Sequence, residues 1–410
     1  MGSQTRFTCS TPLGNMDLER RRVLVDDGMC CAFSFSRAFL FCVNRRFRQM
    51  IAPRNTLLPA FRAARLLIKF ASITSAVIAL YGSASAQLTI TPTFDPSVTD
   101  LTNASAIEAG IYAAITQIEN SITTRFSDPV TIYFTNSTDP NVLGQSLTPQ
   151  EELSYTTYLS DLGANPTLSP LQTAALSTMP VTPGSDLNND TNLFLTAANL
   201  AAIGETNAAE ALVSGEGGGY NSTLTFNFAS LNPSRTGGQV IGNYDEQSVI
   251  FHEVDEVLGI GGTGSELSWD GTGLVPALPS ELGPLDFFRY STNGVRSFAY
   301  GTNTVAYFSI DRGATKLVSF NQNPGGDFAD WSDGVIPSDG SGNTPEQVQD
   351  AFGTPWNGAN YNGYAAANLG VNELTAFQVV GYSLVPEPST YALLGLGALV
   401  MVITARRRVR

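Results

Sequence analysis

Two targeting-type segments, one near each end of the chain, leave residues 87–385 as the part that can build a stable fold. The first segment has a basic flank that starts at Arg62, a short apolar run, and small residues at Ala84-Ser85-Ala86, which is the layout of a secretory signal. Its apolar run is shorter than the roughly 20 residues that cross a membrane. We therefore expect an exported protein that is cleaved after Ala86.

The residues ahead of this signal form an unusually long leader. A start at Met50 gives a signal of more ordinary length, so we expect residues 1–49 to be an over-extended start rather than a domain; a genuine long leader is the alternative. All the cysteines lie in this leader, at Cys9, Cys30, Cys31 and Cys42. The exported domain would therefore contain no thiols and no disulfides.

The second targeting segment occupies residues 386–410. An uncharged, mostly apolar run from Ser389 to Ala405 follows the sequence VPEP and precedes a terminal cluster of arginines. This pattern predicts a short membrane-inserting transmembrane helix with a positive stop on the cytoplasmic side. The order of its three parts resembles the PEP-CTERM sorting signal of Gram-negative bacteria. The resemblance implies recognition by an exosortase and a final place at the outer cell surface or in an exopolysaccharide matrix; an ordinary tail anchor is the alternative.

Charge is distributed as unevenly as the cysteines. Of the 22 Lys and Arg residues, 12 lie before residue 87 and 4 after residue 385, whereas 31 of the 36 Asp and Glu residues lie between these positions. The domain thus carries 6 basic side chains and a formal charge of −25. Such a composition argues against nucleic acid, whose phosphates require clustered Lys and Arg, and it favours divalent cations.

Hydrophobic periodicity predicts a single α+β domain between the two targeting segments. Apolar residues at helical spacing predict a helix over 103–123, and alternation predicts strands over 129–135 and 222–229. A further helix is expected over 245–258, ended by Gly259. The weaker patterns predict helices over 151–162, 171–179, 193–204 and 371–382 and a β-hairpin over 296–313.

The chain has one histidine, His252, and it lies inside the predicted helix 245–258 in the sequence FHEVDEVLG. His252 and Glu256 share one face of this helix, and Glu253 lies about 100° around it. Metal-dependent hydrolases use this spacing for two ligands and a neighbouring general base. The HExxE pattern therefore predicts His252 and Glu256 as metal ligands and Glu253 as the catalytic base. An amphipathic helix with a hydrogen-bonded core histidine is the alternative.

Four segments, FHEVDEVLG, GPLDFFRYS, YFSIDRG and NPGGDFADW, are similar to those of a PEP-CTERM-associated metalloprotease family that carries HExxE. The order of the predicted helices and strands also resembles a zincin-like catalytic domain. The resemblance covers most of residues 87–385 and implies zinc-dependent hydrolysis of peptide bonds. It further implies that a protein or peptide substrate lies along strand 222–229, which we expect to be an edge strand.

A third metal ligand is missing from the helix and its following turn. The longer metzincin-like pattern places this ligand at Gly262, which has no side chain. Because no second histidine exists, carboxylates must complete the site, and Asp286 in GPLDFFRYS is the first candidate. A turn-capping carboxylate is its alternative role. Asp311 and Asp327 are second candidates.

Several further assignments stay open from the sequence alone. Arg289 or Tyr290 would supply an electrophile to the developing oxyanion, with ion pairing or core packing as alternatives. Calcium is an alternative cation, because Asp186 to Asn192 resembles the start of a calcium loop, although it lacks the Gly and Glu of that motif. An acidic loop with Asp327, Asp330 and Asp333 is a second candidate for calcium or substrate.

Two non-peptidase functions compete with the zinc metallopeptidase. A non-catalytic matrix or adhesion protein on a zincin-like scaffold would explain a pattern that has lost its second histidine. A calcium-stabilised carbohydrate binder would suit the acidic loops and the exported location.

Overall fold

The computed structural model describes residues 86–125, 127–180, 192–269, 274–276, 282–298, 306–332, 346–361, 363, 365–385 and 397. The leader and signal ahead of Ala86, residues 186–190, Asp333 and the sorting segment other than Gly397 lie outside the described residues. Within the described part of the chain, no helix is both long and apolar enough to cross a membrane.

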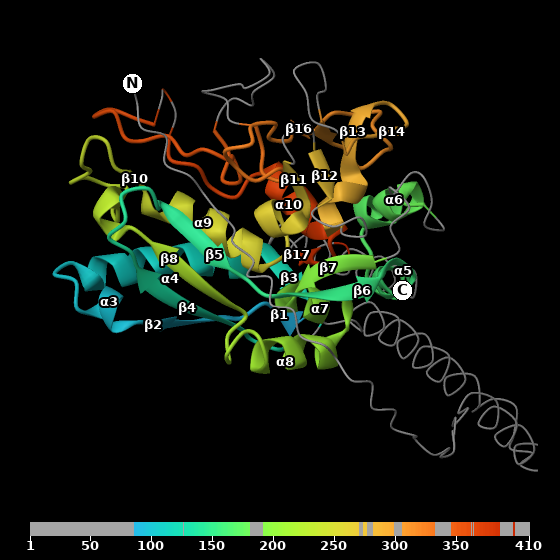
Figure 1. Ribbon diagram of the computed structural model, residues 1–410, viewed down its shortest axis with the longest axis horizontal. Helices are drawn as coiled ribbons and strands as arrows, with labels where there is room; N and C mark the ends of the chain where they lie inside the picture. The colour runs from blue at the N-terminus through green and yellow to red at the C-terminus, as the bar shows by residue number, and fades with distance from the viewer. Residues whose placement is uncertain are drawn as a thin grey trace, which may run out of the picture. The chain divides into compact units, whose positions relative to one another are not determined.

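A four-stranded mixed sheet forms one half of the domain (Figure 1). Its strands, in spatial order, are β2 (Ile90–Phe94), β4 (Val130–Asn136), β8 (Ser222–Phe226) and β5 (Gly144–Leu147). The first three run parallel to one another, and β5 pairs with β8 in the antiparallel direction. The predicted strands 129–135 and 222–229 are confirmed as β4 and β8, but the expected edge position of 222–229 is wrong, because β5 covers that side and is itself the edge.

Alternation along the strands gives this sheet one buried face. Ile132 and Phe134 of β4 are fully buried and stand in register with Ser222 and Leu224 of β8. Their partners on β5 continue the same face, since Ser146 lies opposite Leu224. The intervening threonines are half-buried on the other face. Because buried and half-buried residues alternate along β4 and β8, their strand structure could be predicted from the sequence.

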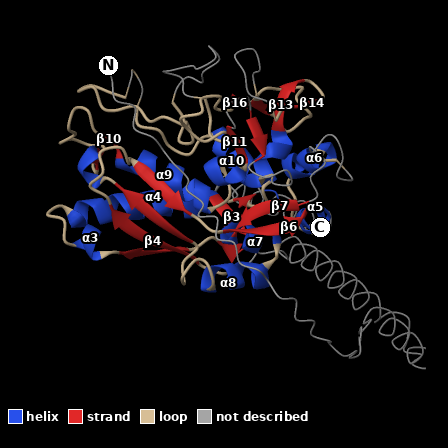
Figure 2. Ribbon diagram, viewed as in Figure 1, coloured by secondary structure: helices blue, strands red, loops and turns tan. Residues whose placement is uncertain are grey.

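Two helices, α4 (Ala104–Ser121) and α9 (Glu246–Val257), pack against each other, and α9 also packs against β5 (Figures 1 and 2). In α4, the apolar side chains Ile107, Ile111, Ala114, Ile115 and Ile118 are buried along one stripe. These helices confirm the predictions over 103–123 and 245–258. The arrangement is mixed α+β, as expected.

The other helices are short. They are α3 (Pro96–Thr99), α5 (Tyr155–Gly163), α6 (Pro170–Thr178), α7 (Ala197–Ile203), α8 (Thr206–Ser214) and α10 (Val371–Val379), with 3-10 turns η2 (Phe228–Ser230), η3 (Gly261–Gly264) and η4 (Pro284–Phe288). Helices α6 and α10 confirm the predictions over 171–179 and 371–382. The predicted helices 151–162 and 193–204 are wrong over their first four residues, which belong to the antiparallel pair β6 (Gln150–Ser154) and β7 (Asn192–Thr196), whereas their remaining residues form α5 and α7. Long-range strand pairing here overrides the local helical pattern.

Small sheets complete the described fold. One contains β1 (Ala86–Gln87), β3 (Ile122–Thr124) and β17 (Ser383–Leu384), in that spatial order. Two strand pairs are β9 (Leu231–Asn232) with β10 (Tyr244–Asp245) and β11 (Leu267–Trp269) with β12 (Leu274–Pro276). A further sheet has the spatial order β14 (Val295–Arg296), β13 (Arg289–Thr292), β15 (Tyr307–Phe308) and β16 (Val318–Ser319). The predicted hairpin 296–313 is wrong in its pairing, because β14 and β15 each pair with β13 rather than with each other.

Glu246, the first residue of α9, lies fully buried opposite α4. A Cβ added at Gly110 of α4 would stand 2.1 Å from Glu246 Oε1, so only glycine leaves room for this carboxyl. Neither oxygen of Glu246 has a hydrogen-bond partner among the described residues. Burial, with a smaller contribution from Asp245, raises the pKa of Glu246 to about 9. Glu246 is therefore a neutral acid at pH 7.

This burial predicts a specific pH dependence for Glu246→Gln. Below pH 4.5 the side chain is neutral in both folded and unfolded chains, whereas between pH 4.5 and about 9 only the unfolded chain releases its proton. The free energy of unfolding of the protein with the native glutamate therefore falls as the pH rises through this window. The Glu246→Gln substitution should therefore increase the free energy of unfolding at pH 7 by about 1–3 kcal/mol more than it does at pH 4.

Denaturant titrations at both pH values measure this difference. Glu210→Gln on the exposed surface of α8 is the matched control and should show no such change. Equal effects of Glu246→Gln at pH 4 and pH 7 would contradict the assignment of a neutral buried acid.

Candidate metal centre

Helix α9 presents the HExxE pattern, and both of its ends are fixed. At the N-terminus, Asp245 accepts a hydrogen bond from Ser248 N (2.8 Å) and pairs with Arg235. At the C-terminus, Gly259 has φ +93°, and a Cβ there would stand 2.9 Å from the Cβ of Asn199. The chain therefore turns sharply after the helix, as a glycine at this position predicts.

His252 is buried on α9, with 1% of its surface exposed. Its Nδ1 lies 3.1 Å from the carbonyl oxygen of Val348. Because a carbonyl can only accept, Nδ1 carries the hydrogen, and the lone pair of the neutral ring is on Nε2. Burial lowers the pKa of His252 to about 4, so the ring is neutral at pH 7. Both features are those of a histidine prepared to bind a metal through Nε2.

Two carboxylates face this nitrogen. Glu256 Oε1 lies 3.8 Å from His252 Nε2, and Asp330 Oδ2 lies 3.7 Å from it. One ligand atom from each of the three residues lies within 4.8 Å of the other two. A tetrahedral cation with bonds of about 2.1 Å would place its donors about 3.4 Å apart, close to these distances. One imidazole and two carboxylates thus form a donor set that fits a divalent cation.

The charges of this group also require a cation or bound protons. Burial, followed by repulsion from Asp327, raises the pKa of Glu256 to about 8. The pKa of Asp330 is raised well above its usual range by burial and by the neighbouring Asp327 and Glu256. Several buried carboxylates cannot ionise together without a compensating positive charge. A divalent cation would supply that charge.

The Asp330 side chain is held close to His252 and Glu256 because the backbone on both sides of it is fixed. Trp331 is fully buried and packs against Phe308 and Phe320, with ring centroids 5.6 and 5.2 Å away. The Trp331 indole donates to Glu373 Oε1 (3.1 Å), and Asn321 N donates to the backbone oxygen of Asp330 (2.8 Å). These contacts fix the backbone on both sides of the Asp330 side chain.

Glu256 is oriented from two directions. The Ser146 hydroxyl of β5 donates to Glu256 Oε2, and the backbone N–H of Gly262 donates to Oε1 (3.2 Å). The edge strand and the turn after α9 therefore both hold this carboxylate. Such outer contacts are typical of metal ligands.

Glu253 lies against β5. A Cβ added at Gly144 would stand 2.4 Å from Glu253 Oε1, which shows how closely this side chain crosses the strand. That oxygen is buried and has no hydrogen-bond partner among the described residues. Burial and then repulsion from Glu256, Asp330 and Asp327 raise the pKa of Glu253 well above its usual range. Glu253 therefore belongs electrostatically to the same cluster.

Gly262, the position of the third ligand in the longer metzincin-like pattern, lies next to Asp327. A Cβ at Gly262 would stand 2.4 Å from Glu256 Oε1 and 3.0 Å from Asp327 Oδ2. The carboxylates of Glu256 and Asp327 thus occupy the space that a side chain at position 262 would use. The loop 321–331 brings this acid and Asp330 to the helix, in place of a longer helix motif.

The structure does not bring Asp286 to His252 and Glu256. Its Oδ1 accepts from the Ser265 hydroxyl (2.7 Å), and its Oδ2 accepts from Gly283 N (2.9 Å), so it caps η4. This is the turn-capping role that stood as its alternative. Asp311 is also elsewhere, since its Oδ1 binds Ser309 Oγ (2.7 Å) and Thr315 N (2.8 Å) in a turn after β15.

Arg289 and Tyr290 lie on β13. The guanidinium of Arg289 is buried, lies over the Phe320 ring at 4.7 Å and donates to the Phe328 carbonyl. It therefore supports the loop that carries Asp327 and Asp330. The Tyr290 ring packs against Arg296, 5.2 Å from its guanidinium carbon. In the described part of the chain, neither side chain is hydrogen-bonded or ion-paired to His252.

The sequence missed Asp330 as a partner of His252. The acidic loop GGDFADW carries the signal: it contains Asp327, a second candidate for the third ligand, but Asp330 is expected there only as a residue for calcium or substrate. Nothing in the spacing indicates that residue 330 returns to residue 252. The contact depends on aromatic packing around Trp331, which a local pattern does not encode.

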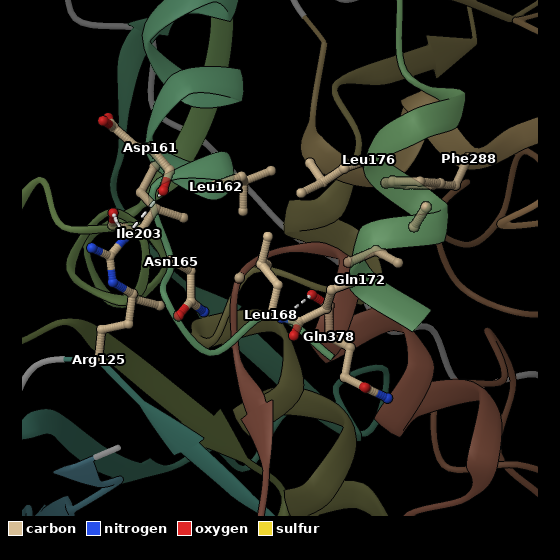
Figure 3. Close-up of a pocket in the computed structure, with 14 residues that line it drawn as sticks. Arg125, Asp161, Leu162, Asn165, Leu168, Gln172, Leu176, Ile203, Phe288 and Gln378 are labelled. Carbon is tan, nitrogen blue, oxygen red and sulfur yellow. Dashed lines mark hydrogen bonds between the residues drawn. The ribbon is translucent and has the colours of Figure 1, made fainter. Parts of the chain in front are cut away.

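A separate small cavity lies between α5, α6, α7 and α10 (Figure 3). Its volume is about 10 Å³, which is room for one water molecule. Arg125 at its rim donates to the carbonyls of Asp161 and Ile203 (3.1 Å each). The cavity shares no residue with the His252 group and is too small for a substrate.

Comparison with known proteins assigns the C-terminal segment. Residues 384–408 match the family model of the PEP-CTERM protein-sorting motif. The chain carries a PEP-CTERM sorting signal. This signal implies export, recognition by exosortase-type machinery and sorting to the cell surface. No curated protein and no solved structure matches the chain.

The geometry predicts different consequences for two aspartates. Asp330→Asn should weaken divalent-cation binding at least tenfold, because an amide is a poorer and uncharged donor. Asp286→Asn should leave the affinity unchanged and cost about 1 kcal/mol of stability through a weaker cap. Calorimetric titration with Zn²⁺ and thermal unfolding of both variants measure these effects. Weaker binding in Asp286→Asn, with normal binding in Asp330→Asn, would reverse the assignment.

Proposed function

We propose that residues 87–385 form an exported zinc-dependent peptidase with a zincin-like domain. The observation that carries this proposal is the convergence of His252 Nε2, Glu256 Oε1 and Asp330 Oδ2 beside an edge strand. The resemblance of the HExxE segment to zincin-like metalloproteases is a second reason for the proposal. The third ligand is now proposed to be Asp330, with Asp327 adjacent, rather than Asp286.

His252, Glu256 and Asp330 would hold the zinc ion. A bound zinc ion polarises a water molecule and lowers its pKa toward neutrality. The nearby positive charge would also favour the ionised forms of the surrounding carboxylates. Ser146 and Gly262 N keep Glu256 oriented toward His252.

Glu253 would act as the general base. It follows His252 in sequence and lies between α9 and Gly144, close to the other carboxylates of the site. Once ionised, its carboxylate would accept a proton from the attacking water and deliver it to the leaving amine. The peptide carbonyl carbon would then gain an oxygen as its bond to nitrogen breaks.

The outer edge of β5 would align the substrate. Asn227 N donates to Leu143 O (3.2 Å), so alternate residues of β5 bond toward β8. Gly144 and Ser146 therefore direct their backbone groups away from β8, where no described strand pairs with them, and both residues are buried in this structure. A peptide added in the extended conformation would lie next to Glu253 and Glu256.

A second function has one observation in its favour. His252, Glu256 and Asp330 are at most 2% exposed, which is typical of a closed structural cation site. A matrix or adhesion protein of the cell surface would use such a site for stability alone. In either case the sorting signal would deliver the protein to the outer surface or exopolysaccharide matrix of a Gram-negative cell, after transient anchoring by the C-terminal segment.

Glu253→Gln separates catalysis from cation binding. The variant should keep stoichiometric zinc, because Glu253 is not among the three grouped donors, and should lose peptidase activity by at least about 100-fold. Metal analysis and turnover of a mixed peptide library measure the two properties. Unchanged turnover would exclude Glu253 as the base. Stoichiometric zinc with no turnover in the wild type would favour the structural cation site.

Gly144→Ala should displace Glu253 without removing a ligand. The added methyl group would stand 2.4 Å from Glu253 Oε1 and 3.0 Å from its Cδ. We expect kcat/KM to fall about 10- to 100-fold while zinc affinity is retained. Gly163→Ala in α5, where a Cβ meets nothing within 4 Å, is the control and should be active. Full activity in Gly144→Ala would contradict the placement of Glu253.

A further inference from the structure

We propose that Gln349 is a positioning residue that turns Asp330 toward the cation. The inference rests on the metal centre of the proposed function and assigns a residue that the HExxE pattern does not contain. Gln349 lies on the segment between the sorting signal and the acidic loop, far from α9 in sequence. Its side chain is fully buried against the cluster.

The Gln349 side-chain amide touches two of the three cation donors. Its Nε2 donates to Asp330 Oδ1 at 3.0 Å. The same nitrogen lies 3.4 Å from Nδ1 and 3.5 Å from Nε2 of His252. The amide therefore donates its hydrogen bond to the carboxylate of the loop and packs against the imidazole of the helix, whose Nδ1 hydrogen is already donated to Val348 O.

This contact determines which oxygen of Asp330 faces the site. Because Oδ1 is engaged by Gln349, the other oxygen, Oδ2, is the one that lies 3.7 Å from His252 Nε2. A donor on the outer oxygen also favours the ionised carboxylate that a cation requires. Without the amide, Asp330 would be free to rotate about its χ2 angle and lose this orientation.

The backbone beside Gln349 fixes its position relative to both partners. Trp331 N donates to Gln349 O (2.8 Å), and Ala351 N donates to Trp331 O (3.0 Å), so the two segments run side by side. The preceding residue, Val348, offers the carbonyl that binds His252 Nδ1. Consecutive residues thus orient His252 through the main chain and Asp330 through a side chain.

Gly261 makes room for this amide. A Cβ at Gly261 would stand 2.0 Å from Gln349 Nε2 and 2.5 Å from its Cδ. Gly261 also has φ +64°, so a substitution there brings backbone strain as well as a clash. Gly218 has a closely similar φ of +60°, but a Cβ there meets nothing within 4 Å. The chain therefore contains a matched pair that separates strain from displacement of Gln349.

The first test uses Gln349→Leu in the full chain, with Co²⁺ as the probe. Leucine keeps a similar volume and removes the donor, so we expect the Co²⁺ dissociation constant to rise about 10- to 100-fold. The visible absorption bands of bound Co²⁺ should also shift, because the oxygen of Asp330 would no longer be held. A side chain that only fills space would leave the spectrum unchanged.

The glycine pair provides a second test that does not depend on the folding of Gln349→Leu. Gly261→Ala should reproduce the weaker affinity and the altered spectrum, whereas Gly218→Ala should show wild-type values with a comparable loss of stability. The role of Gln349 would be overturned if Gln349→Leu bound Co²⁺ with wild-type affinity and a wild-type spectrum. If Gln349→Leu does not fold, the same result in Gly261→Ala would overturn it. Absence of Co²⁺ binding by the wild-type chain would instead overturn the metal centre itself.

Discussion

The site depends on an electrostatic constraint at one nitrogen. The carbonyl of Val348 fixes the hydrogen of His252 on Nδ1, so the Nε2 lone pair faces the carboxylates of Glu256 and Asp330 in a buried environment. Lone pairs and negative charges at these distances repel one another unless a cation or protons lie among them. The turn at Gly259, the contact of Ser146 with Glu256 and the anchoring of Trp331 all serve to hold these three groups together.

The positions around α9 suit this constraint. The helix supplies the imidazole and one carboxylate from a single face, while the loop 321–331 supplies a second carboxylate from far along the chain. Glycine at position 262 leaves space for the carboxylates of Glu256 and Asp327, and glycine at position 144 leaves space for that of Glu253. A chain with one histidine can thus complete a cation site only with acids, in which the exported domain is rich.

Much of the fold could be predicted because it follows from local periodicity. The helices α4, α6, α9 and α10 and the strands β4 and β8 have clear apolar patterns. The pairing of β6 with β7 and the addition of β5 beside β8 depend on contacts between distant segments, so the sequence predicted helices at 151–154 and 193–196 and an edge position for β8 instead. Within the site, the spacing of His252, Glu253 and Glu256 indicated the helix face, but Asp330 and Gln349 reach it only through tertiary packing. Asp286 illustrates the converse, since an acid in a suggestive motif is used as a cap.

X-ray absorption at the metal edge of the zinc-loaded protein tests the central claim most directly. We expect one imidazole ring and otherwise oxygen donors at about 2.0–2.2 Å, with no sulfur. The His252→Ala variant should lose the imidazole scattering together with the bound zinc. A zinc shell made only of oxygen, or one that contains sulfur, would contradict a centre built from His252, Glu256 and Asp330.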